Sequence, residues 1–96
     1  MSNLDKVLAE RGSKYGKFED HAKISQDIKQ ILQDNVLFRS VLLNYDVPPY
    51  ITEGLDMIAH KLGRIANGDP FYDDSWVDIA GYATLVANIL KERNAK

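Results

Sequence analysis

Cysteine is absent from this sequence of 96 residues, and so are long hydrophobic runs and clusters of basic residues. Without cysteine the chain has neither a disulfide framework nor thiol chemistry. No stretch reaches the roughly 20 apolar residues that a membrane-spanning helix needs. The N-terminal residues also lack the basic start and apolar core of a signal peptide. We therefore expect a cytoplasmic protein that makes no contact with membranes.

Charge of one sign does not dominate either. The chain has 12 Lys and Arg against 14 Asp and Glu, interspersed, for a net charge of -2. This balance argues against a protein that binds DNA or RNA polymers through bulk positive charge. The length predicts a single domain over residues 1–96, close to the size at which a monomer is only marginally stable, so self-assembly would help.

Hydrophobic periodicity predicts an all-α fold with a short N-terminal helix and a long antiparallel helix hairpin. The first helix is expected over residues 3–11, with Asn3 as N-cap and Gly12 as its end. A second helix is expected over residues 19–33, whereas the pattern over 35–49 is weak and leaves its conformation open. The hairpin combines 49–67, ended by Gly68 as a left-handed cap, with 73–93. Gly63, in the middle of the third helix, indicates a close helix contact or a nearby ligand.

The last helix is apolar over more than half of its circumference. One stripe along this helix contains Trp76, Ile79, Ala80, Ala83, Ala87 and Leu90, and the apolar surface extends to Tyr82, Leu85 and Ile89. A single partner helix cannot cover so wide a surface, so the helix needs burial on two sides. In so short a chain, the second side is expected to come from another copy, which predicts a homo-oligomer.

The connector over residues 11–16 is the first candidate for ligand binding. Its two glycines allow a close backbone approach, and Tyr15 offers a stacking face beside Lys14 and Lys17. The alternative is a turn whose Tyr15 covers the edge of the core. Lys29 likewise flanks the buried face of the second helix, where a lysine more often lays its stem over apolar surface. His21 is expected to be a packed core residue.

Clustered acids suggest a second class of function. The spacings Glu53-x-x-Asp56 and Asp74-x-x-x-Asp78 loosely resemble the acid clusters of all-α nucleotide pyrophosphohydrolases, which hold Mg²⁺ between paired helices. The match is poor, because Glu53 and Asp56 project away from the apolar stripe and a second E-x-x-E is missing. Asp78 is instead expected to pair with Lys61 or Arg64. We therefore expect no enzyme, no catalytic residue, no metal site and no cofactor; an oligomeric interaction protein without a small ligand is a third possibility.

Two separated blocks of sequence resemble a known family. ERGSKYGKFEDHAKISQDIK (10–29) and LDMIAHKLGRIANGDPFYDDSWVDIAGYATLVA (55–87) are similar to the small phage-encoded anti-CBASS cyclic-oligonucleotide sponges and related phage proteins. The resemblance implies a non-enzymatic immune-evasion protein in the cytoplasm of an infected bacterial host. It also implies a helical homohexamer that sequesters cyclic dinucleotides between paired subunits and cyclic trinucleotides in separate pockets on threefold axes.

The same resemblance implies roles for individual residues. Tyr15 would stack on a base of a cyclic dinucleotide, and Lys29 would meet a phosphate. Arg64 would clamp the phosphates of a cyclic trinucleotide on the threefold axis. Three neighbours of Tyr15 are expected to line the dinucleotide pocket, namely Arg11, Gly16 and Phe18.

Overall fold

The computed structural model describes residues 2–95, which form four helices. They are α1 (Asn3–Tyr15), α2 (Phe18–Leu43), α3 (Pro49–Asn67) and α4 (Asp74–Asn94). The predicted all-α class is confirmed for this part of the chain. No helix within it is long and apolar enough to cross a membrane.

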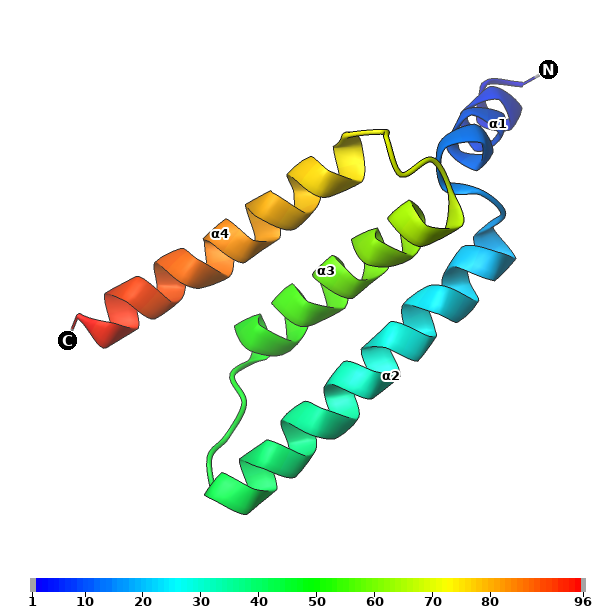
Figure 1. Ribbon diagram of the computed structural model, residues 1–96. Helices are drawn as coiled ribbons and strands as arrows, with labels where there is room; N and C mark the ends of the chain where they lie inside the picture. Colours follow the sequence, from blue (N-terminus) through cyan, green and yellow to red (C-terminus); the bar gives the residue numbers. More distant parts are fainter. Residues whose placement is uncertain (1, 96) are drawn as a thin grey trace.

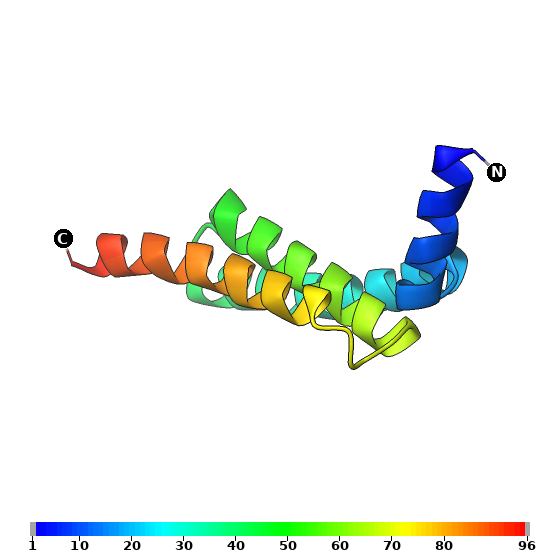
Figure 2. The same ribbon diagram turned by 90° about the horizontal axis from the view of Figure 1, so that it is seen from above.

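Three of the helices form one flat layer. Helix α3 lies in the middle, antiparallel to α2 on one side and to α4 on the other (Figure 1). Helix α1 projects steeply from one end of the layer, as the view from above shows (Figure 2). With α1 included, the chain has principal extents of 53 × 26 × 24 Å. Because α2 and α4 do not meet, each covers only one flank of α3.

Small residues allow the middle helix to lie close to both neighbours. Gly54, Ala59 and Gly63 of α3 are all buried. A Cβ added at Gly54 would come within 2.6 Å of Val86 on α4, and one at Gly63 would come within 3.0 Å of the His21 ring on α2. The close helix contact expected at Gly63 is therefore confirmed, and it compensates for the low helix propensity of glycine.

Helix α1 differs from its predicted bounds at both ends. Its N-cap is Ser2, not Asn3, and Ser2 forms a reciprocal capping box with Asp5. The helix also continues through Gly12 to Tyr15, so the segment 11–15 is helical and not an irregular connector. Nothing lies within 4 Å of a Cβ at Gly12. The helix ends instead at Gly16, whose φ of 78° is a conformation that glycine adopts without steric cost.

Helix α2 runs ten residues beyond its predicted end and absorbs most of the segment whose conformation was left open. Asn35 does not interrupt it, because its side-chain amide donates to the carbonyl of Ile31 inside the helix. Asn44 ends the helix in the left-handed conformation with φ 55°. Pro48 and Pro49 follow, and α3 starts at Pro49, as predicted.

The ends of α3 and α4 agree with the sequence patterns to within one residue, but Gly68 does not. Its φ of -129° is not left-handed, so the predicted type of cap is wrong. A Cβ at Gly68 would overlap the carbonyl oxygen of Lys14. The glycine is needed at this position because the end of α1 passes directly over it.

The chain buries little apolar surface by itself. Among residues 2–95, Ala59 is the one apolar residue classed as buried, and no large side chain is fully covered. On α4, Ile79, Tyr82 and Leu90 are half-buried, whereas Trp76, Ala80 and Ala83 of the predicted stripe remain exposed. A single subunit therefore leaves much of the apolar circumference of α4 uncovered.

Candidate functional site

The turn between α1 and α2 is held in place by the end of α3. The amide of Asn67 donates to the backbone carbonyls of Tyr15 and Lys17, at 2.9 and 3.0 Å. The backbone N–H of Asp69 donates to the carbonyl of Lys14 at 2.8 Å. The carbonyls of Lys14 and Tyr15 belong to the last turn of α1, which leaves them without helical partners, and these bonds satisfy them. The backbone around Tyr15 is thus fixed by residues more than 50 positions away in the sequence.

The Tyr15 side chain is held at two points. Its hydroxyl donates to a carboxylate oxygen of Asp74, at the start of α4, over 3.1 Å. The Arg64 guanidinium lies over its ring, with Cζ 4.2 Å from the ring centroid. Partial burial, followed by the hydrogen bond and negative charge of Asp74, raises the pKa of Tyr15 above its usual value of 10.0. The phenol therefore stays neutral at physiological pH, with one ring face in contact with a cation.

A second aromatic residue extends this arrangement. The Tyr72 ring lies 6.1 Å from that of Tyr15 at an interplanar angle of 58°. On its own face Tyr72 carries the Lys14 ammonium, 4.8 Å from the ring centroid. The two neighbouring rings therefore lie between two cations, with Lys14 on Tyr72 and Arg64 on Tyr15, which holds each ring in a defined position.

Two hollows in the surface meet at Tyr15 and Arg64. The first, of about 460 Å³, lies between the end of α1, the start of α2 and α3. Its lining comprises Leu8, Arg11, Gly12, Tyr15, Gly16, Lys17, Phe18, His21, His60 and Arg64. None of these described lining residues is acidic, and three carry a permanent positive charge. In a chain of net charge -2, this hollow is a local concentration of positive charge beside the half-buried Tyr15 ring and the exposed Phe18 ring. We call it the cationic hollow.

The second hollow, of about 410 Å³, lies on the side of Tyr15 that faces α4. It shares Arg11, Tyr15 and Arg64 with the cationic hollow. Its other lining residues are Val7, Glu10, Lys14, Lys61, Tyr72, Asp74 and Asp78. Because three acids offset its cations, this mixed hollow has no comparable preference for an anion. Tyr15 and Arg64 form the wall between the two.

The structure brings five of the six predicted site residues together. Arg11, Tyr15, Gly16 and Phe18 line the cationic hollow, and Arg64, which the resemblance assigns to a separate trinucleotide pocket, lines it too. Lys29 does not line either of these two hollows of its own subunit. It lies eight residues beyond His21 on the same face of α2, about 12 Å along the helix.

Two histidines form the floor of the cationic hollow. His21 is buried, as predicted, and its Nε2–H donates to the carbonyl of His60 over 3.0 Å. The two rings meet edge to face, with centroids 4.6 Å apart. Burial, and then the charges of His21, Arg64, Lys29 and Lys61, lower the pKa of His60 to about 4. His60 is therefore neutral at physiological pH.

The four acids of the alternative metal site lie apart. Asp74 accepts the Tyr15 hydroxyl, and Asp78 forms an ion pair with Lys61 at 3.0 Å, as predicted. Lys61 itself is 9% exposed, so this ion pair fixes α4 against α3. Asp56 lines a groove between α2 and α3, and Glu53 is exposed. Within residues 2–95, no three His, Asp or Glu side chains are placed to hold a metal ion together.

Sequence reasoning missed several residues that build the site. Asn67 and Asp69 hold the turn, Tyr72 supports the Tyr15 ring, and Asp74 anchors its hydroxyl. Only the run of polar and turn-forming residues from Asn67 to Asp74 gave a signal, which indicated a loop. Its contact with α1 depends on how the helices pack, which a linear pattern does not reveal.

Comparison with known proteins places the chain in a family. No curated protein and no solved structure gives a significant match. Residues 3–90 match the family described as a domain of unknown function, DUF6378. This match spans all of α1, α2 and α3 and most of α4, including both hollows. The chain belongs to the DUF6378 family.

Proposed function

We propose that the protein is a phage immune-evasion protein that binds and sequesters cyclic oligonucleotide messengers of bacterial CBASS defence without cleaving them. The ligands are cyclic dinucleotides, and cyclic trinucleotides as a second class. The observation that carries the proposal is the cationic hollow, where the Tyr15 and Phe18 rings lie beside Arg11, Lys17 and Arg64 with no acid among the lining residues. The resemblance of the blocks 10–29 and 55–87 to the sponge family points to the same ligands.

The chemistry of a cyclic dinucleotide matches this composition. The ligand presents two flat bases and two negatively charged phosphates in a compact ring. An aromatic platform and a few cations recognise both features, and neither a catalytic base nor a metal is needed. Each stacked base contributes roughly 1–3 kcal/mol, and each charge-assisted phosphate contact about 1.5–3 kcal/mol. Two such sets contribute about 5–12 kcal/mol, which is of the same size as the free-energy cost of association of about 4–15 kcal/mol, so the site needs both sets.

The fixed position of Tyr15 supports binding further. Asn67 holds its backbone and Asp74 its hydroxyl, so the ring loses little conformational freedom when a base stacks on it. Arg64 covers one face of the ring and leaves its guanidinium beside the hollow. On this geometry we assign Arg64 to the Tyr15 site. Its guanidinium stacks on one side of the ring, and its N–H groups are available to donate to a phosphate of the ligand.

Assembly into a homo-oligomer, hexameric by the family resemblance, completes the proposal. The cationic hollow is open on the side of Phe18, whose side chain is 80% exposed, and of Leu8, which is also exposed. A second subunit placed there would cover both residues and enclose a ligand. The exposed apolar residues of α4, among them Trp76 and Leu85, offer a further contact between subunits. A ligand bound at such a boundary meets two symmetry-related sets of rings and cations.

Isothermal titration calorimetry with a panel of cyclic di- and trinucleotides, at physiological salt, tests the proposal. We expect saturable binding of at least one cyclic dinucleotide and recovery of the ligand intact after the protein is denatured. Linear dinucleotides of the same bases are the matched control and should bind more weakly, because the ring closure is lost.

Two results would overturn the proposal. One is the absence of any thermal stabilisation by the whole panel, which would favour an interaction protein without a small ligand. The other is conversion of the nucleotide in the presence of Mg²⁺, which would favour a hydrolytic enzyme. Native mass spectrometry of the complex counts subunits and ligands in the same measurement.

A further inference from the structure

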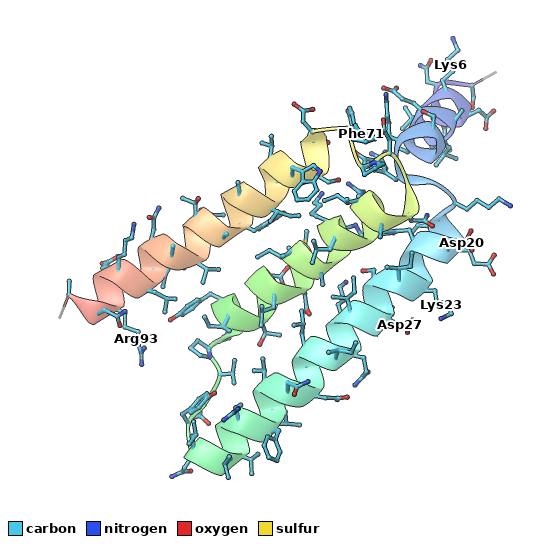
Figure 3. The ribbon with its side chains drawn as sticks, viewed as in Figure 1. Lys6, Asp20, Lys23, Asp27, Phe71 and Arg93 are labelled. Atoms are coloured by element: carbon cyan, nitrogen blue, oxygen red, sulfur yellow. The ribbon has the colours of Figure 1, made fainter. Side chains whose placement is uncertain are left out.

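One outer face of α2 changes its character halfway along the helix. In the first half this face carries Asp20, Lys23 and Asp27, which point away from α3 (Figure 3). Lys23 and Asp27 form an exposed ion pair at 3.1 Å, as is usual for a face in contact with water. Beyond Asp34 the charged residues give way to large apolar ones, and Arg39 is the one charged residue between positions 35 and 45.

These side chains are largely exposed, although they are apolar. Five of them, here called the distal apolar surface, are Leu37 (63% exposed), Phe38 (63%), Val41 (73%), Leu42 (60%) and Tyr45 (48%). Phe38, Val41 and Leu42 follow the spacing of a helix stripe that packs on another helix. Apolar side chains in such a group on a monomer mark a surface that is covered by another molecule.

The accessible surface area of the chain is larger than that of a compact monomer of the same mass. Its accessible surface is 7200 Å², whereas a compact monomer of this mass exposes about 5,600 Å². Its radius of gyration is 16.2 Å, against about 12.5 Å for a compact chain of this length. The excess of about 1,600 Å² is twice the ~800 Å² that one partner buries in a specific interface of standard size. One subunit therefore has enough surplus surface for two separate contacts.

We propose that the distal apolar surface is a self-association interface, in which the same surface of a second copy packs against it about a twofold axis. A partner that supplies the missing core must be present whenever the chain folds, in equal amount. Another copy of the chain always meets this condition. In a twofold interface the same surface of each subunit forms the contact, so the apolar stripe of one copy packs on the identical stripe of the other.

This interface is separate from the candidate ligand site. Twenty residues of continuous helix lie between Phe18, at the cationic hollow, and Phe38, which corresponds to about 30 Å. The distal contact therefore uses one part of the surplus surface, and a contact near the hollow uses the other. Two different contacts per subunit lead to closed assemblies larger than a dimer. The interface does not depend on the identity of the ligand.

The absence of cysteine makes a direct test possible. Single substitutions Phe38→Cys, Val41→Cys and Leu42→Cys introduce one thiol each, because the native chain has none. Near a twofold axis the two copies of a residue approach each other, so we expect a short bis-maleimide to link at least one variant efficiently into covalent dimers. Lys23→Cys is the matched control, since it is equally exposed on the same face of α2 but lies before the apolar stretch, and it should stay mainly monomeric on denaturing gels.

A second variant tests the energetic role of the interface. Phe38→Glu with Leu42→Glu places four carboxylates in the proposed contact, and native mass spectrometry should show a smaller assembly than that of the wild type. If this variant does not fold, the cross-linking result still decides. A wild-type chain that is folded and monomeric at micromolar concentration would overturn the proposal. So would cross-linking of Lys23→Cys as efficient as that of all three apolar positions, or a monomer that binds phospholipid vesicles through this surface.

Discussion

The Arg64 guanidinium lies 4.2 Å from the centre of the Tyr15 ring, although the two residues are 49 positions apart and belong to different helices. This contact joins α1 to α3 and forms the wall between the two hollows. Arg64 therefore lines the same hollow as every candidate residue of the dinucleotide site except Lys29. The role of Arg64 can therefore be tested separately from that of a threefold-axis pocket.

Arg64→Ala is expected to lower the affinity for cyclic dinucleotides by about tenfold or more, because one charge-assisted phosphate contact is lost. Arg64→Lys keeps the charge but not the flat stacking surface, and should bind with intermediate affinity. Calorimetry with a cyclic dinucleotide and a cyclic trinucleotide measures both effects. If Arg64→Ala impairs only the trinucleotide, Arg64 serves a separate pocket, as the family resemblance implies, and our assignment to the Tyr15 site is wrong.

Tyr15→Ala should weaken dinucleotide binding by about 1–3 kcal/mol for each base that stacks, or about fivefold to 150-fold for one base. Tyr15→Phe is the matched variant, since it keeps the ring and removes only the hydroxyl that donates to Asp74. It should bind within a few fold of the wild type and lose about 1 kcal/mol of unfolding free energy. Equal binding by Tyr15→Ala and the wild type would remove this ring from the site.

Lys29→Ala tests whether the site extends between subunits. Lys29 lies outside the hollows that Tyr15 lines in its own subunit. Its charge still acts on His60 at the floor of the cationic hollow, so a direct contact with the ligand is indicated only by a loss well above that of a general charge effect. We expect a loss of about 1.5–3 kcal/mol of binding free energy, measured by calorimetry. The exposed Lys23→Ala serves as control for a general loss of positive charge, and an unchanged affinity in Lys29→Ala would confine the site to the cationic hollow.

Gly63→Ala and Gly12→Ala should have opposite effects on stability. A Cβ at position 63 would come within 3.0–3.3 Å of His21 and Ser25, and His21 cannot move easily because it is bonded to the His60 carbonyl. We expect the variant to lose about 1–2 kcal/mol of unfolding free energy in chemical denaturation. Gly12 has open space around it, so alanine there should add up to about 1 kcal/mol through its higher helix propensity.

Stability should fall in mild acid because of His60. Its pKa is about 4 in the folded chain, against 6.5 when the chain is unfolded. Between these values the unfolded chain binds a proton that the folded chain does not, so the free energy of unfolding falls as the pH drops from 6.5 to 4. Above pH 6.5 the residue has no such effect. We expect a loss of about 1 kcal/mol, reduced from the full shift by the exposed part of the ring.

The matched variant is His60→Gln, which keeps a polar side chain that does not titrate. Thermal denaturation of both proteins from pH 7.5 to pH 4 isolates the contribution of His60, since the carboxylates titrate equally in each. The difference in Tm between the two should change with pH below 6.5 and stay constant above it. A constant difference over the whole range would contradict the burial of His60 in the folded chain.

Local patterns determined the helical class and the hairpin. The apolar residues of α3 recur every three or four positions, and Pro49 and Gly68 mark its ends, so its bounds could be read directly. The same method failed at Gly12, through which α1 continues, and it left open the segment after Asn35, most of which belongs to α2. Glycine and asparagine have low helix propensity but do not forbid a helix, so α1 continues through Gly12 and α2 through Asn35.

The composition of the candidate site was visible in the sequence, but its geometry was not. Tyr15, Arg11 and Gly16 attracted attention because rings, cations and glycines occur together in a short segment. By contrast, Arg64 contacts the Tyr15 ring from 49 positions away, and Asp74 accepts a hydrogen bond from the Tyr15 hydroxyl from 59 positions away. Only the packing of α1 over the end of α3 brings them together, since no periodicity within one helix specifies that contact.

The sequence by itself determined that this chain is helical, that it has no thiol chemistry and that its last helix carries more apolar surface than one neighbouring helix can cover. The tertiary structure decided where that surplus lies. Three helices in one layer leave α2 and α4 covered on one side only, and the second half of α2 is the most apolar part that remains exposed. The reason is physical: periodicity fixes which residues share a face of a helix, whereas the order of the helices in space fixes which faces meet.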